Sequence, residues 1–445
     1  MLHSDIIIIG CGAAGLAAAA RLSRAKKSVL ILEARNRIGG RIWTIDDSAF
    51  AMPVELGAEF IHGRPLTTWQ LVREGHLTTY DVPYDIFHQR GERLVHIPDY
   101  PAALNKIMGG LSRLRHDVSF ADYLRRSRTR SKGSDARRLA LSFVQGFDAA
   151  DPERSSAKSL TDKHKCFGCI GQEMQFRLQG GYGALVEHLR QSLDSKRVKT
   201  RLNSVVTEIR WKKSMVDVRC HTGNRILSHR ARSLIVTLPL GILQQMDTPG
   251  AVRFIPELPE KRRAASQIGS GPIVKAVMQF ERPFWEDDSV IRAAGGSDKM
   301  RDASFFQVPQ APFHTWWTAR PLRLPVLTAW AGGPKAVALS GHPKSFIIDA
   351  AIESLTILFR LSRPKVRALL KQIHISDWAT DPYSHGAYSY DIVGGLRARA
   401  SLAKPVERTL FFAGEATDTA GEASTVSGAL SSGYRAAEEV LHALS

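Results

Sequence analysis

Near the N-terminus, glycines and one acid are spaced in a way that suits a bound dinucleotide. The segment Gly10-Cys11-Gly12-Ala13-Ala14-Gly15 matches the pattern GxGxxG, and Glu33 follows 18 residues after its last glycine. The glycines allow a tight turn and a close approach of the backbone to a pyrophosphate, while the start of a following helix offers N–H groups. An acid at this spacing accepts hydrogen bonds from an adenosine ribose. The pattern alone does not separate NAD from FAD.

The residues that follow Glu33 favour FAD. The run Glu33-Ala34-Arg35-Asn36-Arg37-Ile38-Gly39-Gly40-Arg41 contains a second pair of glycines and guanidinium donors for a diphosphate. It resembles the RxGGR segment of FAD-dependent oxidoreductases of the glutathione-reductase-like superfamily. That superfamily includes amine oxidases and carotenoid desaturases.

The elements that must position this loop are predicted from the pattern of apolar residues. Asp5–Ile9 and Ser28–Leu32 are mainly apolar runs, typical of strands buried on both faces, and Ala13–Arg24 between them indicates a helix. Such a β-α-β unit predicts a parallel sheet with a right-handed crossover. Further predicted strands are Val205–Ile209, Val216–Cys220, Leu234–Leu238, Ile273–Phe280, Val326–Trp330 and Thr409–Ala413. Further predicted helices are Lys344–Phe359 and a C-terminal helix from about Gly428 to Leu444.

The predicted fold class is α/β, with a Rossmann-like FAD-binding domain of the glutathione-reductase type interleaved with an α+β substrate-binding domain. A chain of 445 residues is long enough for two domains, and no Pro/Ser-rich linker separates them. We assign residues 1–75, 191–255 and 391–445 to the FAD-binding domain. Residues 76–190 and 256–390 are assigned to the substrate domain, with a mostly helical part at about 101–190.

Composition and charge exclude several classes of protein. Apolar residues make up 44% and charged residues 23% of the chain, and 4 cysteines are too few for a disulfide scaffold. The longest apolar stretch, Ile6–Ala20, is shorter than a membrane span, so no membrane span and a cytoplasmic location are expected. A net charge of +18, concentrated in Arg125–Arg138, leaves binding to nucleic acid or an acidic surface open, although a solvated surface is favoured. A monomer or homodimer is expected.

Three further segments narrow the resemblance to the flavin-containing amine oxidases, which include monoamine oxidases, polyamine oxidases and lysine-specific histone demethylases. The first segment is Glu55-Leu56-Gly57-Ala58-Glu59-Phe60-Ile61-His62-Gly63. The resemblance implies that Gly57 and Ala58 run beside the flavin ring, with Glu59 next to them in the cofactor site. It also implies that Phe60 and His62 face the substrate.

The second segment places a lysine inside an apolar strand. Lys275 stands in Gly271-Pro272-Ile273-Val274-Lys275-Ala276-Val277, where an ammonium without a partner is costly. It matches the family lysine that holds a water against N5 of the flavin and is thought to assist the reaction with oxygen. The alternative interpretation is an edge-strand lysine that points to solvent.

The third segment is a C-terminal block. Gly386-Ala387-Tyr388-Ser389-Tyr390 resembles the GxYSY stretch of the family, whose first tyrosine, here Tyr388, flanks the amine in front of the flavin. Gly414 and Glu415 match residues that meet the ribityl and phosphate groups in relatives. Gly428-Ala429 is expected to open the last helix, whose N-terminal dipole would stabilise the anionic edge of reduced flavin. The remaining expected cofactor residues are Val206, Thr425 and Val426.

Departures from the family pattern bear on the cofactor and the substrate. Monoamine oxidases attach FAD through a cysteine just before the flanking tyrosine, and Ala387 stands at that position here, so non-covalent FAD is expected. Their second cage aromatic aligns with Thr425, so a two-tyrosine cage is incomplete. The Ser424-Thr425 pair resembles polyamine oxidases instead.

The activity that the resemblance implies is oxidation of an amine to an imine by hydride transfer to flavin N5, with reoxidation by O2 and release of H2O2. The expected catalytic residues are Lys275, Tyr388 and His62, and the expected substrate contacts are Phe60, His62, Tyr388 and Thr425. The substrate is expected to be a polyamine or an alkyl or aryl-alkyl amine. Candidate acids for a polyamine tunnel are Glu59, Asp85, Glu173 and Asp302.

Other functions stay open at this point: an L-amino-acid oxidase, a desaturase-like FAD oxidoreductase, and a non-catalytic basic flavoprotein. Lys275 and the segment Gly386–Tyr390 argue against the desaturase-like enzyme. Cys166 and Cys169 form a CxxC pair with no second ligand pair for zinc, so no metal site is expected. Structural or incidental thiols are favoured over a redox pair there.

Overall fold

A five-stranded parallel sheet holds the N-terminal glycine loop at the carboxyl end of its middle strand. The computed structural model describes residues 4–126, 135–161 and 174–445. The strand order is β10 (Val198–Arg201), β2 (Val29–Leu32), β1 (Ile6–Ile9), β14 (Ser233–Val236) and β23 (Leu410–Phe412). Helix α1 (Ala13–Arg24) connects β1 to β2, which pair in parallel, so the predicted β-α-β unit is confirmed.

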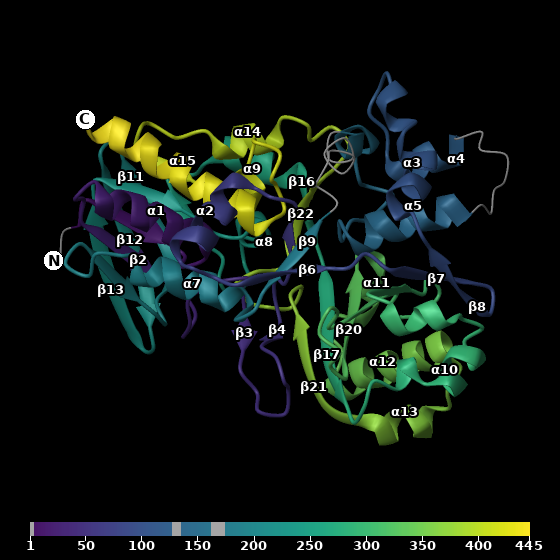
Figure 1. Cartoon of the computed structure of the whole chain (residues 1–445). Helices are drawn as coiled ribbons and strands as arrows, with labels where there is room; N and C mark the ends of the chain where they lie inside the picture. The colour runs from purple at the N-terminus through teal and green to yellow at the C-terminus, as the bar shows by residue number, and fades with distance from the viewer. Residues whose placement is uncertain (1–3, 127–134, 162–173) are drawn as a thin grey trace.

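Both faces of this parallel sheet are covered, as its apolar strands require. Ile6 and Ile8 point to the face on which α1 packs with α7 (Gly181–Gln191) and α15 (Val426–Leu444). Ile7 and Ile9 point to the other face, which packs on a four-stranded sheet. The order of that sheet is β13 (Arg225–Ala231), β12 (Met215–Thr222), β11 (Val205–Lys212) and β15 (Arg253–Ile255). Figure 1 shows α1 and α15 side by side on the outside of this half.

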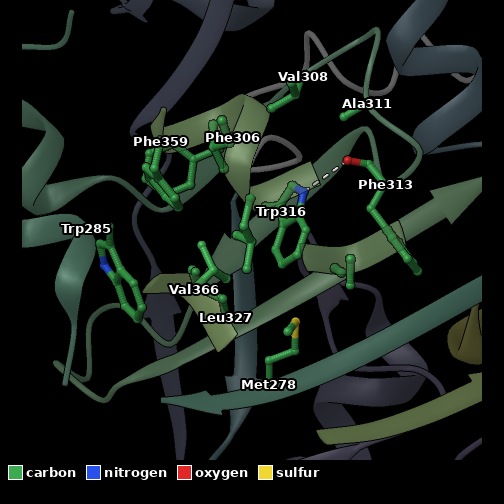
Figure 2. Packing of buried hydrophobic residues seen from close by; sticks show 14 of the residues in the cluster. Met278, Trp285, Phe306, Val308, Ala311, Phe313, Trp316, Leu327, Phe359 and Val366 are labelled. Atoms are coloured by element: carbon green, nitrogen blue, oxygen red, sulfur yellow. Dashed lines mark hydrogen bonds between the residues drawn. The ribbon is translucent and has the colours of Figure 1, made fainter. Parts of the chain in front are cut away.

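The second half of the fold contains a seven-stranded sheet. Its order is β21 (Leu370–Asp377), β17 (Ile273–Phe280), β20 (Val326–Gly332), β19 (Thr315–Thr318), β18 (Phe305–Gln307), β7 (Ile86–Arg90) and β8 (Arg93–Ile97). One face packs on α12 (Lys344–Phe359) through large apolar side chains. Figure 2 shows this core, in which Trp316 Nε1 donates to the carbonyl of Phe313 at 3.0 Å. Side chains alternate along a strand, so the residues between these core positions point to the opposite face of the seven-stranded sheet. That face is turned toward the half of the fold that contains the parallel sheet.

A helical group packs at the end of the seven-stranded sheet that carries β7 and β8 (Figure 1). Its helices are α3 (Tyr100–Met108), α4 (Phe120–Arg126) and α5 (Asp135–Gly146). Leu104, Phe120 and Val144 belong to the buried core that joins them. This group lies within the part of the chain that was predicted to be mostly helical.

Shorter elements complete the fold. The short strands are β3 (Thr44–Ile45), β4 (Val54–Glu55), β5 (Ile61–His62), β6 (Thr79–Val82), β9 (Gln175–Leu178), β16 (Ile268–Gly271) and β22 (Tyr388–Asp391). The short helices are α2 (Leu66–Glu74), α8 (Leu240–Gln244), α9 (Pro259–Ser266), α10 (Asp288–Ala293), α11 (Pro334–Leu339), α13 (Arg363–Leu369) and α14 (Ala398–Ala403). Strand β22 pairs with β16, and β5 and β6 both pair with β9.

Several elements begin and end where the sequence predicts them, namely α1, α12 and β17. Helix α15 begins earlier than predicted, at Val426, because the hydroxyl of Thr425 caps it by accepting from the N–H of Gly428. The division into domains stays a prediction, and α7, which falls mainly in the predicted substrate segment, packs on α1 and α2. Across the described ranges, no helix combines the length and the apolar character needed to cross a membrane.

Candidate active site

A cavity of about 560 Å³ extends from the glycine loop after β1 to the inner face of the seven-stranded sheet. The predicted site residues in its lining are Gly10, Gly12, Ala14, Glu33, Ala34, Arg35, Gly39, Gly40, Arg41, Gly57, Ala58, Glu59, Phe60, His62, Val206, Lys275, Tyr388, Gly414, Glu415, Thr425 and Val426. Gly15 is the exception, because it packs behind the loop against Gly10. The fold thus brings the three separate parts of the sequence pattern to one cavity.

The glycine loop is shaped for a diphosphate. Gly10 has a φ of +98°, which side chains disfavour, and a Cβ atom at Gly15 would lie 2.0 Å from the carbonyl oxygen of Gly10. Gly12 precedes the first turn of α1, and no side chain caps that turn, so its N–H groups are available to an anion. Glycines beside uncapped N–H groups fit the pyrophosphate of a dinucleotide.

Glu33 follows β2 and is buried beside this loop. Its carboxylate oxygens accept from the backbone N–H of Cys11 at 2.7 Å and from that of Arg35 at 2.9 Å. A carboxylate can accept about four hydrogen bonds, so acceptor capacity remains for the hydroxyls of a ribose. The residue therefore both shapes the loop and suits the adenosine end of the cofactor.

The predicted arginines of this region are anchored by carboxylates. Arg35 forms a bidentate pair with Asp381, at 2.6 and 2.8 Å. Arg41 donates to Glu415 and to the carbonyl of Ala387, each at 2.8 Å. Burial would raise the pKa of Glu415, but neighbouring guanidinium groups, Arg41 first, hold it below its usual value. The guanidinium of Arg41 thus ties the nucleotide segment both to Glu415 and to the segment before Tyr388.

The first turn of α15 closes the cavity on another side. The hydroxyl of Thr425 accepts from the N–H of Gly428 at 3.1 Å and donates to the carbonyl of Glu422 at 2.7 Å. Val426 and Ala429 of the same turn line the cavity, so the positive end of the helix dipole lies beside it. The Thr425 hydroxyl is therefore used in the helix cap.

The inner face of the seven-stranded sheet forms the other end of the cavity. Along β17, Val274 and Ala276 enter the hydrophobic core, whereas Lys275 lines the cavity. Trp317 on β19 and Trp330 on β20 line it in the same way, and Trp330 pairs in register with Lys275. The alternative of a solvent-exposed edge lysine is wrong, because β17 lies between β20 and β21 and Lys275 is 0% exposed.

The ammonium of Lys275 has a carboxylate partner. Nζ donates to Oε2 of Glu59 at 2.8 Å and to the carbonyl of Gly57 at 3.3 Å. The Oε1 atom of Glu59 accepts from Arg177 Nε at 2.9 Å and from Trp317 Nε1 at 3.0 Å. Burial would raise the pKa of Glu59, but Lys275 and Arg177 hold it below its usual value. The result is a buried cluster of two cations and one anion.

An aromatic wall faces this cluster, braced by carbonyls of the last residue of α5 and of the residue after it. The rings of Tyr388 and Trp330 have centroids 6.5 Å apart and planes inclined by 19°. Tyr388 Oη donates to the carbonyl of Phe147 at 2.7 Å, and Trp330 Nε1 donates to that of Gly146 at 2.8 Å. Burial raises the pKa of Tyr388 well above its usual value, so the phenol stays protonated and keeps this hydrogen bond.

His62 is neutral in this site. Burial lowers its pKa to about 4, so the imidazole carries no charge at neutral pH. Its ring centroid lies 5.1 Å from that of Phe147 and 6.1 Å from that of Phe60. Within the part of the chain that the structure describes, Nδ1 of His62 has no hydrogen-bond partner. An unused ring nitrogen in the cavity lining suits contact with an uncharged amine.

The candidate tunnel acids are mostly placed elsewhere. Glu59 is used by the buried cluster, and Glu173 lies outside the described residues. Asp302 forms ion pairs with Arg320 and Arg323, Asp85 lies 3.4 Å from Nε2 of His96, and neither acid lines the cavity. Asp148, which the sequence analysis did not single out, does line it.

Sequence reasoning also missed Trp317, Trp330 and Phe147, which stand in segments without a motif, and it gave no role to Arg177. A signal for Trp317 existed, because Trp316 and Trp317 are adjacent in one strand and so must face opposite sides of the sheet. Arg177, the partner of Glu59, had no comparable signal.

Two other features of the sequence fall partly or wholly outside the described residues. The basic run Arg125–Arg138 includes residues 127–134, which lie outside them, while Arg125 pairs with Asp122 and Glu153, each at 2.8 Å. Cys166 and Cys169 also lie outside the described residues.

A cavity that joins a dinucleotide loop to a buried lysine and an aromatic wall is the arrangement of a flavin-dependent oxidoreductase. The family model for flavin containing amine oxidoreductases matches residues 13–441 of this chain. The chain therefore belongs to that family; it is an amine oxidoreductase, and its cofactor is FAD.

Related proteins of this family match nearly the whole chain. It is 29% identical to polyamine oxidase 4 of Oryza sativa subsp. japonica, over 98% of this chain and 88% of that one. It is also 29% identical to polyamine oxidase 2 of Arabidopsis thaliana, over 98% and 87%. The same identity holds for lysine-specific histone demethylase 1 homolog 3 of Arabidopsis thaliana, of which the chain spans 30% of the length.

Solved structures share the fold. Putrescine oxidase bound to putrescine superimposes with a TM-score of 0.79 at 20% identity, covering 99% of both chains. Cyclohexylamine oxidase from Brevibacterium oxydans IH-35A gives a TM-score of 0.78 at 21% identity, again covering 99% of both chains. The predicted α/β class with an FAD-binding and a substrate-binding part is therefore confirmed.

Proposed function

We propose that this protein oxidises an amine to an imine with non-covalently bound FAD, and that O2 accepts the electrons. The observation that supports this most is that the dinucleotide loop, Lys275 and Tyr388 line one cavity. FAD, when bound, supplies the redox chemistry, taking a hydride from the carbon next to nitrogen and passing the electrons to O2 to give H2O2. The residues of the chain bind and orient the amine and keep water out.

The residues at the two ends of the cavity divide the binding of FAD between them. The glycine loop and the first turn of α1 would hold the pyrophosphate, and Glu33 the adenosine ribose. The first turn of α15 would place its positive dipole end at the flavin. Ala387, next to Tyr388, carries no nucleophilic group, which supports non-covalent binding.

The other end of the cavity would bind the amine in its uncharged form. The buried cluster of Lys275, Arg177 and Glu59 has one more positive than negative charge, so it repels an ammonium group. His62 is neutral and adds no charge. Tyr388 and Trp330 would orient the substrate between their rings and the cofactor, since their side chains are held by backbone carbonyls.

An alkyl or aryl-alkyl monoamine is the favoured substrate. The lining of this end is largely aromatic: Phe60, Tyr84, Tyr100, Phe143, Phe147, Phe305, Trp317 and Trp330. A polyamine carries distal ammonium groups that need carboxylates, and the candidate acids are engaged or lie elsewhere. Cyclohexylamine oxidase, one of the proteins of the same fold, is named for a monoamine.

A diamine or polyamine is the second candidate, because Asp148 lines the cavity and its charge acts on Tyr388. Two similar proteins are polyamine oxidases, and one solved structure holds putrescine. In this case Asp148 would pair with a distal ammonium.

Anaerobic bleaching of the flavin absorbance tests the proposal. Five compounds are added one at a time: cyclohexylamine, 2-phenylethylamine, putrescine, spermidine and an L-amino acid. Each is tested on wild type, on Asp148→Asn and on Asp85→Asn. The last variant is the control, because the Asp85 carboxylate lies outside the cavity. We expect the monoamines to bleach the flavin fastest. When air is admitted, the flavin colour should return and H2O2 should appear. Faster bleaching by putrescine that Asp148→Asn abolishes would favour the diamine. No bleaching by any amine, with FAD fully bound, would contradict amine oxidation.

A further inference from the structure

We propose that Glu59 is a positioning residue, whose carboxylate fixes the ammonium of Lys275 at one point of the cavity lining. The proposal goes beyond the function proposed above and depends on it only for the role of Lys275 in the reaction with oxygen. The resemblance to the family assigns Glu59 to the cofactor. In the structure, its carboxylate lines the cavity and accepts from three side-chain donors, on Lys275, Arg177 and Trp317.

A lysine side chain needs such a restraint to act as a fixed charge. Its long stem can adopt many rotamers, and its ammonium has no preferred plane of hydrogen bonding. Here the ammonium donates to Glu59 Oε2 at 2.8 Å and to the Gly57 carbonyl at 3.3 Å. Both acceptors belong to residues 57–59, which themselves line the cavity. The lysine is therefore held by the segment expected to run beside the flavin.

The carboxylate that holds the lysine is itself held. The side chain of Glu59 is 7% exposed, and Arg177, which binds its Oε1 atom, is 3% exposed. Arg177 also donates to the carbonyls of Thr318 and Arg320, at 3.1 and 2.9 Å. Trp317 Nε1 binds the same Oε1 atom from the strand beside β20. The position of the ammonium is thus set by the sheet and not by the lysine stem.

Charge adds to this geometric restraint. Without Glu59, the buried cations Lys275 and Arg177 would lose the carboxylate that both of them bind, and their mutual repulsion would favour displacement of the ammonium. A preorganised charge assists a reaction because its position costs no reorganisation when the reacting charge develops. Displacement of the ammonium should therefore reduce its effect even when the charge itself is kept.

The test compares Glu59→Asp, Lys275→Met and the double variant with wild type. Aspartate keeps the negative charge but withdraws it by one methylene, so it displaces the ammonium without removing it. The holoenzymes are photoreduced, which requires no amine, and their reoxidation by O2 is followed by stopped flow. The midpoint potential of the bound flavin and the FAD content are measured on the same samples. Glu208→Asp is the matched control, because Glu208 is also buried and paired with arginines, Arg210 and Arg253, but lies outside the cavity.

We expect Glu59→Asp to slow reoxidation by about tenfold. This is a smaller effect than the one expected when the preorganised charge is removed altogether, as in Lys275→Met. Its flavin potential should move toward that of Lys275→Met, whereas Glu208→Asp should leave both quantities unchanged. In the Lys275→Met background, the second substitution should have no further effect. Equal slowing in the presence and absence of Lys275, or wild-type reoxidation in Glu59→Asp, would overturn the proposal. Because the flavin is reduced by light, a failure of amine oxidation is recorded separately, by the bleaching experiment.

Discussion

Replacing Glu33 by glutamine keeps the shape of the side chain and removes the charge on which the glycine loop depends. One carboxylate oxygen accepts from the N–H of Cys11 at 2.7 Å and the other from the N–H of Arg35 at 2.9 Å. An amide has a single acceptor oxygen. In Glu33→Gln, one of the two backbone N–H groups must therefore face an NH2 group in a buried place.

The size of the effect follows from this lost contact. A hydrogen bond to a charged acceptor contributes about 1.5–3 kcal/mol. If the loop must keep its shape to bind FAD, that loss corresponds to an increase of about 10- to 150-fold in the dissociation constant of FAD. The apoprotein can relax the loop, so its own stability should fall by less than the binding free energy.

The assay titrates apoprotein with FAD, following the quenching of flavin fluorescence, and measures urea unfolding of the apoprotein in parallel. Asp5→Asn is the matched control, because Asp5 holds the N–H and hydroxyl of Ser28 at the opposite end of the same strands, at 2.8 and 2.7 Å. We expect Asp5→Asn to lower stability without changing FAD affinity. Unchanged FAD affinity in Glu33→Gln would refute the reasoning, as would equal losses of affinity in both variants.

Three further outcomes are expected. Lys275→Met should keep its FAD but react with O2 about 100-fold more slowly; stopped-flow reoxidation at the wild-type rate would exclude that role. Acid precipitation should release FAD into the supernatant, since Ala387 offers no attachment point; a yellow pellet would contradict this. Burial raises the pKa of Glu55 from 4.5 to about 7, so the folded state binds this proton more tightly, and stability should fall as pH rises through that interval. Glu55→Gln should flatten this part of the stability profile in urea unfolding; an unchanged slope would contradict the assignment.

Local patterns predicted the nucleotide half well. The loop from Gly10 to Gly15 and helix α1 depend on backbone conformation and on contacts between near neighbours, which the residue types reveal. In the other half of the fold, strand β17 was predictable from its run of mostly apolar residues. The start of α15 was predicted at about Gly428. The helix begins at Val426, because the hydroxyl of Thr425 caps it.

Partners across the fold were not predictable in the same way. Lys275 was recognised as costly to bury, but its partner Glu59 lies 216 positions away in the chain. Their meeting depends on the segment after β4 lying against β17. The same holds for Tyr388 and Trp330, whose side chains are held by carbonyls at the C-terminal end of α5.

The dinucleotide loop and its flanking elements therefore follow from the residues alone, because glycine loops, caps and strand alternation act over a few positions, whereas the flavin and the class of reaction were indicated by resemblance to a family. Which groups meet in the cavity was decided by the tertiary structure. Glu59 lines the cavity and also binds Lys275 and Arg177, and Asp148, which no motif marks, lines it too. Burial, ion pairing and charge balance are properties of residues far apart in sequence, and they arise only when the two sheets enclose a common cavity.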